Sequence, residues 1–251
     1  MNNKIIIGIV VVAVLVLGGW YLMNQDKTGE NGNNTNPPPP SSGIEGGGKV
    51  IFSITDAAAD MKAVTAVRMT VSKIEMESAT EGWVTVSNQT QTHDLLDLKA
   101  RNDWALLAET NVPADTYNQV RLMVQKVEVV MSTTTKTAKL PSGELKLVGK
   151  VVVEEDTTSS VNIDVFADKS LHTTGKGEFI FAPVVKMESR SDAEVSVANN
   201  DTVTVSGGKV DAAVNAGMDI DGTVKTNFML DLKTDLEIQG GVIKAKGLLK
   251  L

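Results

Sequence analysis

Apolar and polar residues alternate one by one along most of the chain beyond residue 48. In segment 112–124, Pro113 and Asp115 form a turn, and every second residue from Val120 to Val124 is then apolar. Alternation with a period of two predicts a β-strand that buries one face and exposes the other. Similar segments recur between turns, so we expect about ten short strands. The expected strands are 49–56, 67–72, 73–77, 82–87, 93–98, 120–124, 127–131, 145–153, 161–166 and 178–186.

The alternation changes phase once inside a continuous apolar stretch. Apolar residues stand at odd positions from Val67 to Val71 and then at even positions, at Ile74 and Met76. A slip of one residue within a strand is what a β-bulge produces. The sequence therefore predicts a bulge between residues 72 and 73.

One segment of the body favours a helix. Residues 102–109 contain good helix formers after Asn102 and Asp103, either of which can cap a helix N-terminus. The predicted fold class is therefore all-β, a β-sandwich with one short helix.

The N-terminal part has a different character. Residues 5–23 carry no charge and are long enough to span a bilayer as a helix. Lys4 precedes them, and Trp20 and Tyr21 stand near their end, so the positive-inside rule places the rest of the chain outside the cytoplasm. A cleaved signal peptide is the alternative interpretation. Residues 24–48 are rich in proline, glycine and asparagine and predict a linker.

The C-terminal part predicts two hairpins by register. A two-residue turn at Gly207-Gly208 would pair Val205 with Val210 and Val203 with Ala212. A second turn at Gly240-Gly241 would pair Ile238 with Ile243 and Leu236 with Ala245. On its other face, Glu237 would lie opposite Lys244 and Asp235 opposite Lys246. These hairpins predict a small antiparallel C-terminal sheet.

Composition excludes several kinds of site. The formal net charge is −7, which argues against a nucleic-acid-binding protein, because such proteins need a basic patch. The chain has no cysteine, so disulfides, thiolate metal sites and cysteine nucleophiles are excluded. No nucleophile elbow, zinc-protease motif, phosphate loop or dinucleotide fingerprint is found. We therefore expect neither an enzyme nor a bound cofactor.

Several short motifs occur along residues 49–188. They are Ser-Ile-Thr-Asp-Ala at 53–57, Gly-Trp-Val-Thr-Val at 82–86, Asp-Leu-Leu-Asp-Leu at 94–98, Val-Pro-Ala-Asp-Thr-Tyr-Asn-Gln-Val-Arg-Leu at 112–122, Leu-Pro-Ser at 140–142, Leu-Lys-Leu at 145–147, Val-Asn-Ile-Asp at 161–164, and His-Thr-Thr-Gly-Lys-Gly at 172–177 before Phe179 and Pro183. With these motifs, residues 49–188 resemble the domain-of-unknown-function family numbered 4382, which occurs in envelope proteins of archaea and bacteria. The resemblance implies an extracytoplasmic β-sandwich of transthyretin-like or carboxypeptidase-regulatory-like type, and it implies no activity. The expected fold class is therefore a transthyretin-like or Ig-like β-sandwich.

Loop carboxylates are the candidates for a metal site, because hard cations take oxygen ligands from loops. The four weak candidates are Asp56, Asp60, Asp164 and Asp168. Their alternative role is in turns and caps. Asp219-Ile-Asp-Gly222 resembles the middle of a calcium loop, but the first and twelfth ligand positions lack a carboxylate, which favours a turn.

Histidines and aromatic residues give a second set of candidates. His93 and His172 would form a site only if the fold brought them together, and we expect structural roles for both. Trp83, Trp104 and Tyr117 could form a sugar-stacking surface, but core positions are favoured for the two tryptophans. Asn33, Asn88 and Asn200 begin glycosylation sequons at about the frequency expected by chance.

Together these patterns predict four regions. They are a transmembrane anchor or signal peptide at 1–23, a linker at 24–48, a β-sandwich at 49–190 and a C-terminal hairpin module at 191–251. We expect a single-pass cell-membrane protein that presents a non-catalytic binding or structural module outside the cytoplasm. Its expected partners are the membrane and another surface protein. The alternatives are a self-associating surface component and, less favoured, a hydrolase or metal-dependent enzyme.

Overall fold

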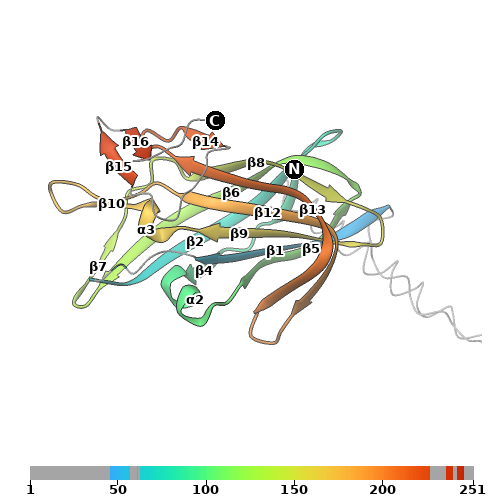
Figure 1. Ribbon diagram of the computed structural model, residues 1–251, viewed down its shortest axis with the longest axis horizontal. Coiled ribbons are helices and arrows are strands. Elements are labelled where there is room, and N and C mark those ends of the chain that lie inside the picture. The colour runs from blue at the N-terminus through green and yellow to red at the C-terminus, as the bar shows by residue number, and fades with distance from the viewer. Residues whose placement is uncertain (1–45, 57–60, 62, 227–235, 240–241, 246–251) are drawn as a thin grey trace, which may run out of the picture. The chain divides into compact units, whose positions relative to one another are not determined.

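The computed structural model describes residues 46–56, 61, 63–226, 236–239 and 242–245, and its ribbon is drawn in Figure 1. Two sheets, the first mixed and the second antiparallel, lie face to face in a sandwich-like, all-β arrangement. The first sheet has six strands, and its β1 pairs with β5 on one side and, in parallel, with β9 on the other. Its order is β14 (Val224–Thr226), β13 (Val203–Met218), β12 (Val184–Val197), β9 (Thr158–Val165), β1 (Gly47–Asp56) and β5 (Ala105–Pro113).

The second sheet is built around the two longest neighbouring strands, β2 and β6. Strands β3 and β4 pair with successive parts of β2, while β7 and β8 pair with successive parts of β6. The strands are β2 (Val64–Ser78), β3 (Gly82–Ser87), β4 (Gln91–Asp94), β6 (Asp115–Met131), β7 (Thr134–Thr137) and β8 (Glu144–Val153).

Smaller elements complete the described chain. Two short hairpins stand outside the main sheets, and two short helices connect strands. They are β10 (Leu171–Thr173) with β11 (Phe179–Phe181), β15 (Leu236–Gln239) with β16 (Val242–Ala245), α2 (Leu95–Arg101) and α3 (Ala167–Ser170).

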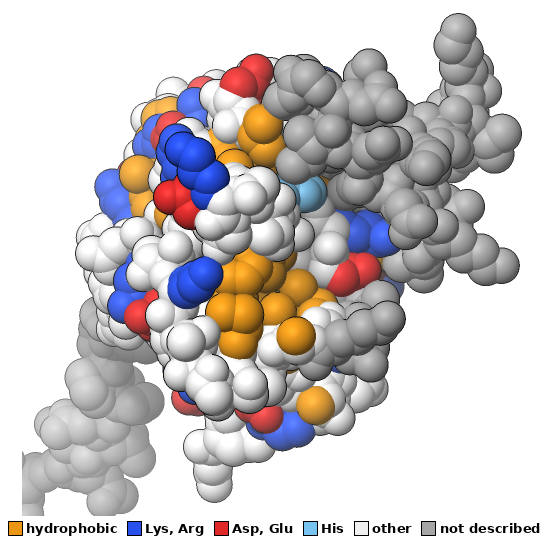
Figure 2. All heavy atoms as spheres, turned by 90° about the vertical axis from the view of Figure 1, so that its left-hand side faces the viewer, with side chains coloured by type: hydrophobic (Ala, Val, Ile, Leu, Met, Phe, Trp, Pro, Cys, Tyr) orange, Lys and Arg blue, Asp and Glu red, His pale blue; other side chains and the backbone are white. Residues whose placement is uncertain are grey.

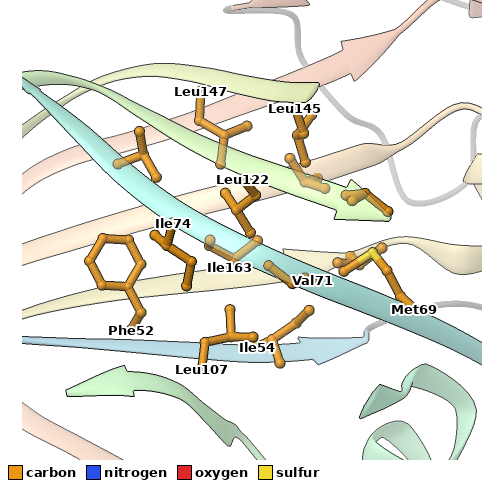
Figure 3. Packing of buried hydrophobic residues seen from close by; sticks show 14 of the residues in the cluster. Phe52, Ile54, Met69, Val71, Ile74, Leu107, Leu122, Leu145, Leu147 and Ile163 are labelled. Atoms are coloured by element: carbon orange, nitrogen blue, oxygen red, sulfur yellow. The ribbon is translucent and has the colours of Figure 1, made fainter. Parts of the chain in front are cut away.

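Alternate side chains of the two sheets meet in one apolar core, which Figure 3 shows from close by. Phe52 and Ile54 of β1 point toward the second sheet, from which Ile74 and Leu122 point back. All four are almost fully buried. Each such side chain contributes roughly 1.5–3 kcal/mol when it leaves water. This burial selects the register, because a slip of one residue would turn the apolar face of a strand toward solvent.

The predicted bulge in β2 is confirmed. The pairing of β2 with β6 shifts register between Thr70 and Val71 and again between Val71 and Lys73. The shift lets Val71 and Ile74 both reach the core, although they lie three positions apart along the strand. Strand β2 therefore stays continuous across the change of phase.

The predicted helix at 102–109 is wrong. Residues 105–113 form strand β5, which pairs with β1, and the helix lies earlier, at Leu95–Arg101. Leu95 and Leu98 bury one face of this helix, and Asn102 ends it in the left-handed conformation with φ 54°. The strand expected at 93–98 accordingly stops at Asp94.

The predicted turn at Gly207-Gly208 is also wrong. Both glycines lie inside β13, where Gly207 pairs with Ala193, and the hairpin reverses instead at residues 198–202. Gly207, Gly208 and Asp192 all have positive φ, and the β12–β13 hairpin bends away from the sheet there (Figure 1). Positive φ occurs in a sharp bend of a strand as well as in a tight turn, so a pair of glycines alone does not distinguish the two.

The register predicted for the last hairpin is confirmed. Ile238 pairs with Ile243, Leu236 with Ala245 and Glu237 with Lys244. The Gly240-Gly241 turn and the pair of residues 235 and 246 lie outside the described residues. The boundary expected between residues 190 and 191 falls inside β12, because β12 continues to Val197 and β13 extends the first sheet.

The predicted anchor and most of the linker lie outside the described residues. Among the helices of the described part of the chain, none is long and apolar enough to span a membrane.

Candidate functional site

A hairpin and an edge strand from separate parts of the sequence meet at one end of the sandwich. The β10–β11 hairpin is joined by a tight loop, in which Thr174 N donates to Glu178 O at 2.8 Å and Gly177 N donates to Thr174 O at 2.9 Å. Glu178 N also donates to the Thr174 hydroxyl at 3.2 Å. The loop is thus held by its own hydrogen bonds, and Gly177 supplies the positive φ of 74° that the turn needs.

Backbone hydrogen bonds attach this hairpin to the segment that follows β7. Lys139 N donates to Phe179 O at 2.8 Å, and Phe181 N donates to Lys139 O at 2.9 Å. The Lys136 ammonium donates to Gly177 O at 2.9 Å. These contacts bring two distant segments together and fix the spacing of their lysines.

The two segments enclose a pocket of about 520 Å³, here called the lysine pocket. Its volume lies in the range of about 300–1,000 Å³ that is usual for ligand sites. Its lining is Lys136, Thr137, Lys139, Thr174, Lys176, Gly177, Glu178, Phe179 and Ile180.

The lysine pocket is locally basic in an acidic protein. Three lysines and a single glutamate line it, whereas the whole chain has a formal net charge of −7. The Lys136 ammonium lies over the Phe179 ring, 5.8 Å from its centroid. Ammonium groups and threonine hydroxyls are hydrogen-bond donors to anions. The pocket can therefore hold an anionic group beside an apolar surface.

The lysine pocket lies at the end of the sandwich opposite to the start of β1. Strand β6 begins beside that start, because Ala114 N donates to Gly46 O at 3.0 Å, and it ends at Met131, which pairs with Thr134 of β7. Its 17 residues span roughly 50 Å at the usual strand rise. Figure 2 looks onto the far end, where basic and acidic side chains stand around a hydrophobic patch.

The described candidates Asp56, Asp164 and Asp168 do not form a cluster that could hold a metal. Asp56 is buried at the end of β1, and its Oδ1 accepts from Ala167 N at 3.1 Å, which fixes the start of α3. Asp164 lies on β9 opposite Thr55, and Asp168 forms an ion pair with Lys169 at 3.8 Å. Asp60 lies outside the described residues. Within the described part of the chain, no three aspartate, glutamate or histidine side chains are close enough together to hold a metal.

The two histidines lie on different sheets. His93 of β4 pairs with Met69 of β2, and His172 of β10 pairs with Ile180 of β11. Burial lowers the pKa of both imidazoles below the usual value of 6.5, although the charge of Asp201 opposes this for His93. The neutral imidazole is therefore favoured at both positions near pH 7.

The three aromatic residues are also dispersed. Tyr117 is fully buried, and its hydroxyl donates to Pro113 O at 2.8 Å; burial raises the pKa of this tyrosine to about 12. Trp83 is 36% exposed and stacks on Arg121, 3.9 Å from the ring centroid, so its predicted core position is wrong. Trp104 is half-buried and lines a separate pocket beside the β12–β13 hairpin.

Sequence patterns alone did not identify the lysine pocket. Residues 173–177 have the composition of a turn, and the lysines at 136 and 139 lie almost forty positions earlier. Only the pairing of Lys139 with the β11 strand brings the three lysines together. The one available signal was a glycine-flanked lysine, Gly175-Lys176-Gly177, in a loop between strands.

A comparison with protein families shows to which family the chain belongs. Residues 47–183, more than half of the chain, match the family described as domain of unknown function DUF4382. The chain belongs to this family. The DUF4382 match includes every strand from β1 to β11 and hence the loop with Lys176. It ends just before β12, although β12 lies at the centre of the first sheet. No curated protein and no solved structure matches this DUF4382 chain.

Proposed function

We propose that this DUF4382 protein is a non-catalytic binding module of the cell surface, and that the lysine pocket binds an anionic group of its partner. The observation that carries the proposal is the convergence of Lys136, Lys139 and Lys176 on one pocket of an acidic chain. Ammonium groups at a partly apolar pocket favour a phosphate, sulfate or carboxylate group attached to a larger molecule.

The proposed location rests on the N-terminal sequence. The uncharged segment 5–23 is long enough for a single membrane anchor, and residues 24–48 have the composition of a linker. We therefore propose a partner outside the cytoplasm for the lysine pocket. We further propose that the sandwich-like fold is of the transthyretin-like or Ig-like type.

The absence of an activated nucleophile from the pocket supports a binding role. The Thr174 hydroxyl already accepts a hydrogen bond from Glu178 N, and no histidine lines the described pocket. General acid–base catalysis needs a group whose pKa is near the working pH within hydrogen-bond reach of the reacting atom. Lysine ammonium groups that are open to solvent bind anions without such chemistry.

Photo-crosslinking on intact host cells tests the proposed function. A photoreactive residue replaces Thr137 in the lysine pocket or, as a control, Thr85 on β3, and the captured peptides are identified by mass spectrometry. We expect one reproducible anionic partner from Thr137 only. Crosslinks only between copies of this chain would instead support the self-associating surface component.

Charge-matched variants separate the pocket from the overall charge. Replacing Lys136, Lys139 and Lys176 by glutamine should weaken capture about tenfold or more, because each charged hydrogen bond is worth about 1.5–3 kcal/mol. Replacing the exposed Lys126, Lys146 and Lys209 by glutamine changes the net charge equally and should leave capture unchanged. Equal losses in the two triple variants would contradict the proposal.

A further inference from the structure

The bent β12–β13 hairpin encloses a second pocket on the outer side of the first sheet. The hairpin tip is fastened to the start of β5, where Val203 N donates to Trp104 O at 2.7 Å and Leu106 N donates to Asp201 O at 2.8 Å. Between this tip and the sheet lies a pocket of about 380 Å³, here called the hairpin pocket. Its lining is Asn102, Asp103, Trp104, Asn162, Thr202, Val203, Thr204 and Val205.

Hydrogen bonds to residues outside the lining of the hairpin pocket hold Asp103 and Asn162 in place. The Asp103 carboxylate accepts from Arg101 Nη1 at 2.7 Å, and the Asp103 carbonyl accepts from the Thr55 hydroxyl at 2.6 Å. Ser53 Oγ donates to the Asn162 side-chain carbonyl at 2.9 Å, so the two N–H groups of the same amide are the part that a ligand can use. Such preorganisation reduces the entropy lost on binding.

The lining of the hairpin pocket selects against charged ligands. Asparagine amides, threonine hydroxyls and one carboxylate offer both donors and acceptors, and no lysine or arginine is among the described lining residues. The Asp103 carboxylate is already paired with Arg101, so the lining offers no uncompensated charge to a charged ligand. A neutral ligand with several hydroxyl groups matches this set, because each hydroxyl both donates and accepts.

Trp104 adds the apolar part of the recognition. Its indole is half-buried in the lining, and its backbone is fixed by the bond from Val203. The face of an aromatic ring carries partial negative charge and attracts the partly positive C–H groups of a flat apolar surface. A pyranose ring has such a C–H face and polar hydroxyls at its rim. The Trp104 ring therefore fits the C–H face of a sugar, and the polar side chains of the lining fit its hydroxyl groups.

We propose that the hairpin pocket binds a neutral pyranose residue, as a free sugar or as a unit of a surface glycan. This site is separate from the lysine pocket, since the two pockets share no lining residue.

The test is a titration of the full-length chain, kept in a detergent without a sugar headgroup, with methyl glycosides of glucose, galactose, mannose and N-acetylglucosamine. Saturation-transfer NMR reports binding, and the part of the tryptophan fluorescence change that is lost in Trp104→Ala reports the environment of Trp104. We expect at least one neutral glycoside to bind and glucuronate to bind less tightly. Trp104→Ala should weaken binding about tenfold, through loss of the ring contact.

Two further variants keep the test decisive. Trp83→Ala removes a tryptophan from the second sheet, where it stacks on Arg121, and should leave sugar binding unchanged. Thr204→Val removes one exposed hydroxyl without changing side-chain shape, so it should weaken binding and preserve the fold even where Trp104→Ala does not fold.

The sugar proposal fails independently of the anion proposal. Absence of binding by every neutral glycoside would overturn it, as would binding that survives both Trp104→Ala and Thr204→Val. Equal or tighter binding of glucuronate would also overturn it. The triple glutamine variant of the lysine pocket should retain full sugar binding, which separates the two sites.

Discussion

At the scale of single residues, a few backbone positions decide where strands turn and where they bend. Asp115 is one of them, at the start of β6. Its carboxylate accepts from the hydroxyls of Ser78 and Thr80 and from Thr116 N, and these bonds lower its pKa although burial opposes them. The end of β2 is thereby tied to the start of β6.

Gly208 is the second such position, and its substitution gives a prediction. A Cβ added at Gly208 would lie 2.6 Å from Ser191 O and 2.9 Å from Ala193 Cα. Gly207 has a similar positive φ but no atom within 4 Å of an added Cβ. Gly207→Ala should therefore cost only the conformational strain, about 1 kcal/mol, whereas Gly208→Ala should cost about 3 kcal/mol.

Urea unfolding of the two alanine variants measures this difference. The adjacent Gly207→Ala protein serves as the control, because it shares the backbone strain and lacks the clash. Equal losses of stability in the two variants would show that the Ser191 backbone moves aside at no cost.

At the scale of elements, an ionic cluster crosses the outer face of the second sheet. Arg121 on β6 bonds Glu75 of β2 through Nε at 2.9 Å and Glu144 of β8 through Nη1 at 2.7 Å, and Lys73 bonds the other oxygen of Glu75 at 2.6 Å. Burial alone would raise the pKa of Glu75, but the bonds and charges of Lys73 and Arg121 lower it overall. The cluster thus joins three strands.

Removal of Arg121 tests the strength of this cluster. Arg121→Met should lower the free energy of unfolding at pH 7 by about 2–3 kcal/mol, because Glu75 then stays buried with only Lys73 as partner. Lys146→Met removes an exposed lysine 3.5 Å from Glu144 and should cost less than about 1 kcal/mol.

The pH dependence of the same variants checks the cause. A carboxyl whose pKa is lowered by folding stabilises the fold above its ordinary value of 4.5, and this contribution is lost as the pH falls through the lower folded-state pKa. The stability difference between wild type and Arg121→Met should therefore shrink below pH 4.5. A difference that stays constant into the acid range would contradict a role for the ionised Glu75.

Local patterns predicted the elements whose burial follows a simple period. The bulge in β2 was visible because Val71 and Ile74 had to share one buried face. The helix was misplaced because Ala105, Leu106 and Leu107 are good helix formers, yet β5 gains more from pairing with β1. The correct helix did leave a signal, since Leu95 and Leu98 are three residues apart and Asp97 pairs with Arg101 at 2.9 Å.

The candidate sites could not be predicted because they depend on contacts between distant segments. The lysine pocket needs the bond between Lys139 and Phe179, and the hairpin pocket needs a bend at Gly207 and Gly208 that resembled a turn. The sequence did supply Trp104 as a sugar-stacking candidate, although it favoured a core position. Neither contact has a local period that a pattern could reveal.

At the scale of the whole molecule, the first sheet extends beyond the family match. The match ends at residue 183, but β12 pairs with β9 and β13 pairs with β12. Strand β13 also places Val203, Ala216 and Met218 in buried positions. The matched region therefore depends on strands that follow it.

Truncation tests this dependence. A chain that ends at Arg190 loses half of β12 and all of β13, together with roughly 5 kcal/mol of apolar burial, which approaches the whole stability of a domain. We expect it not to unfold cooperatively in a thermal melt followed by circular dichroism. A chain that ends at Thr226 keeps the whole first sheet and should melt cooperatively. Two equal melting curves would show that β13 is dispensable.

Strand β6 also has a mechanical consequence. It runs from beside Gly46 to the neighbourhood of the lysine pocket, so tension between a bound partner and the N-terminal segment would act nearly parallel to the strand. Force parallel to a strand loads all of its interstrand hydrogen bonds in shear. These bonds must then break together rather than one after another. With the partner that we propose for the lysine pocket, the domain would carry force along β6.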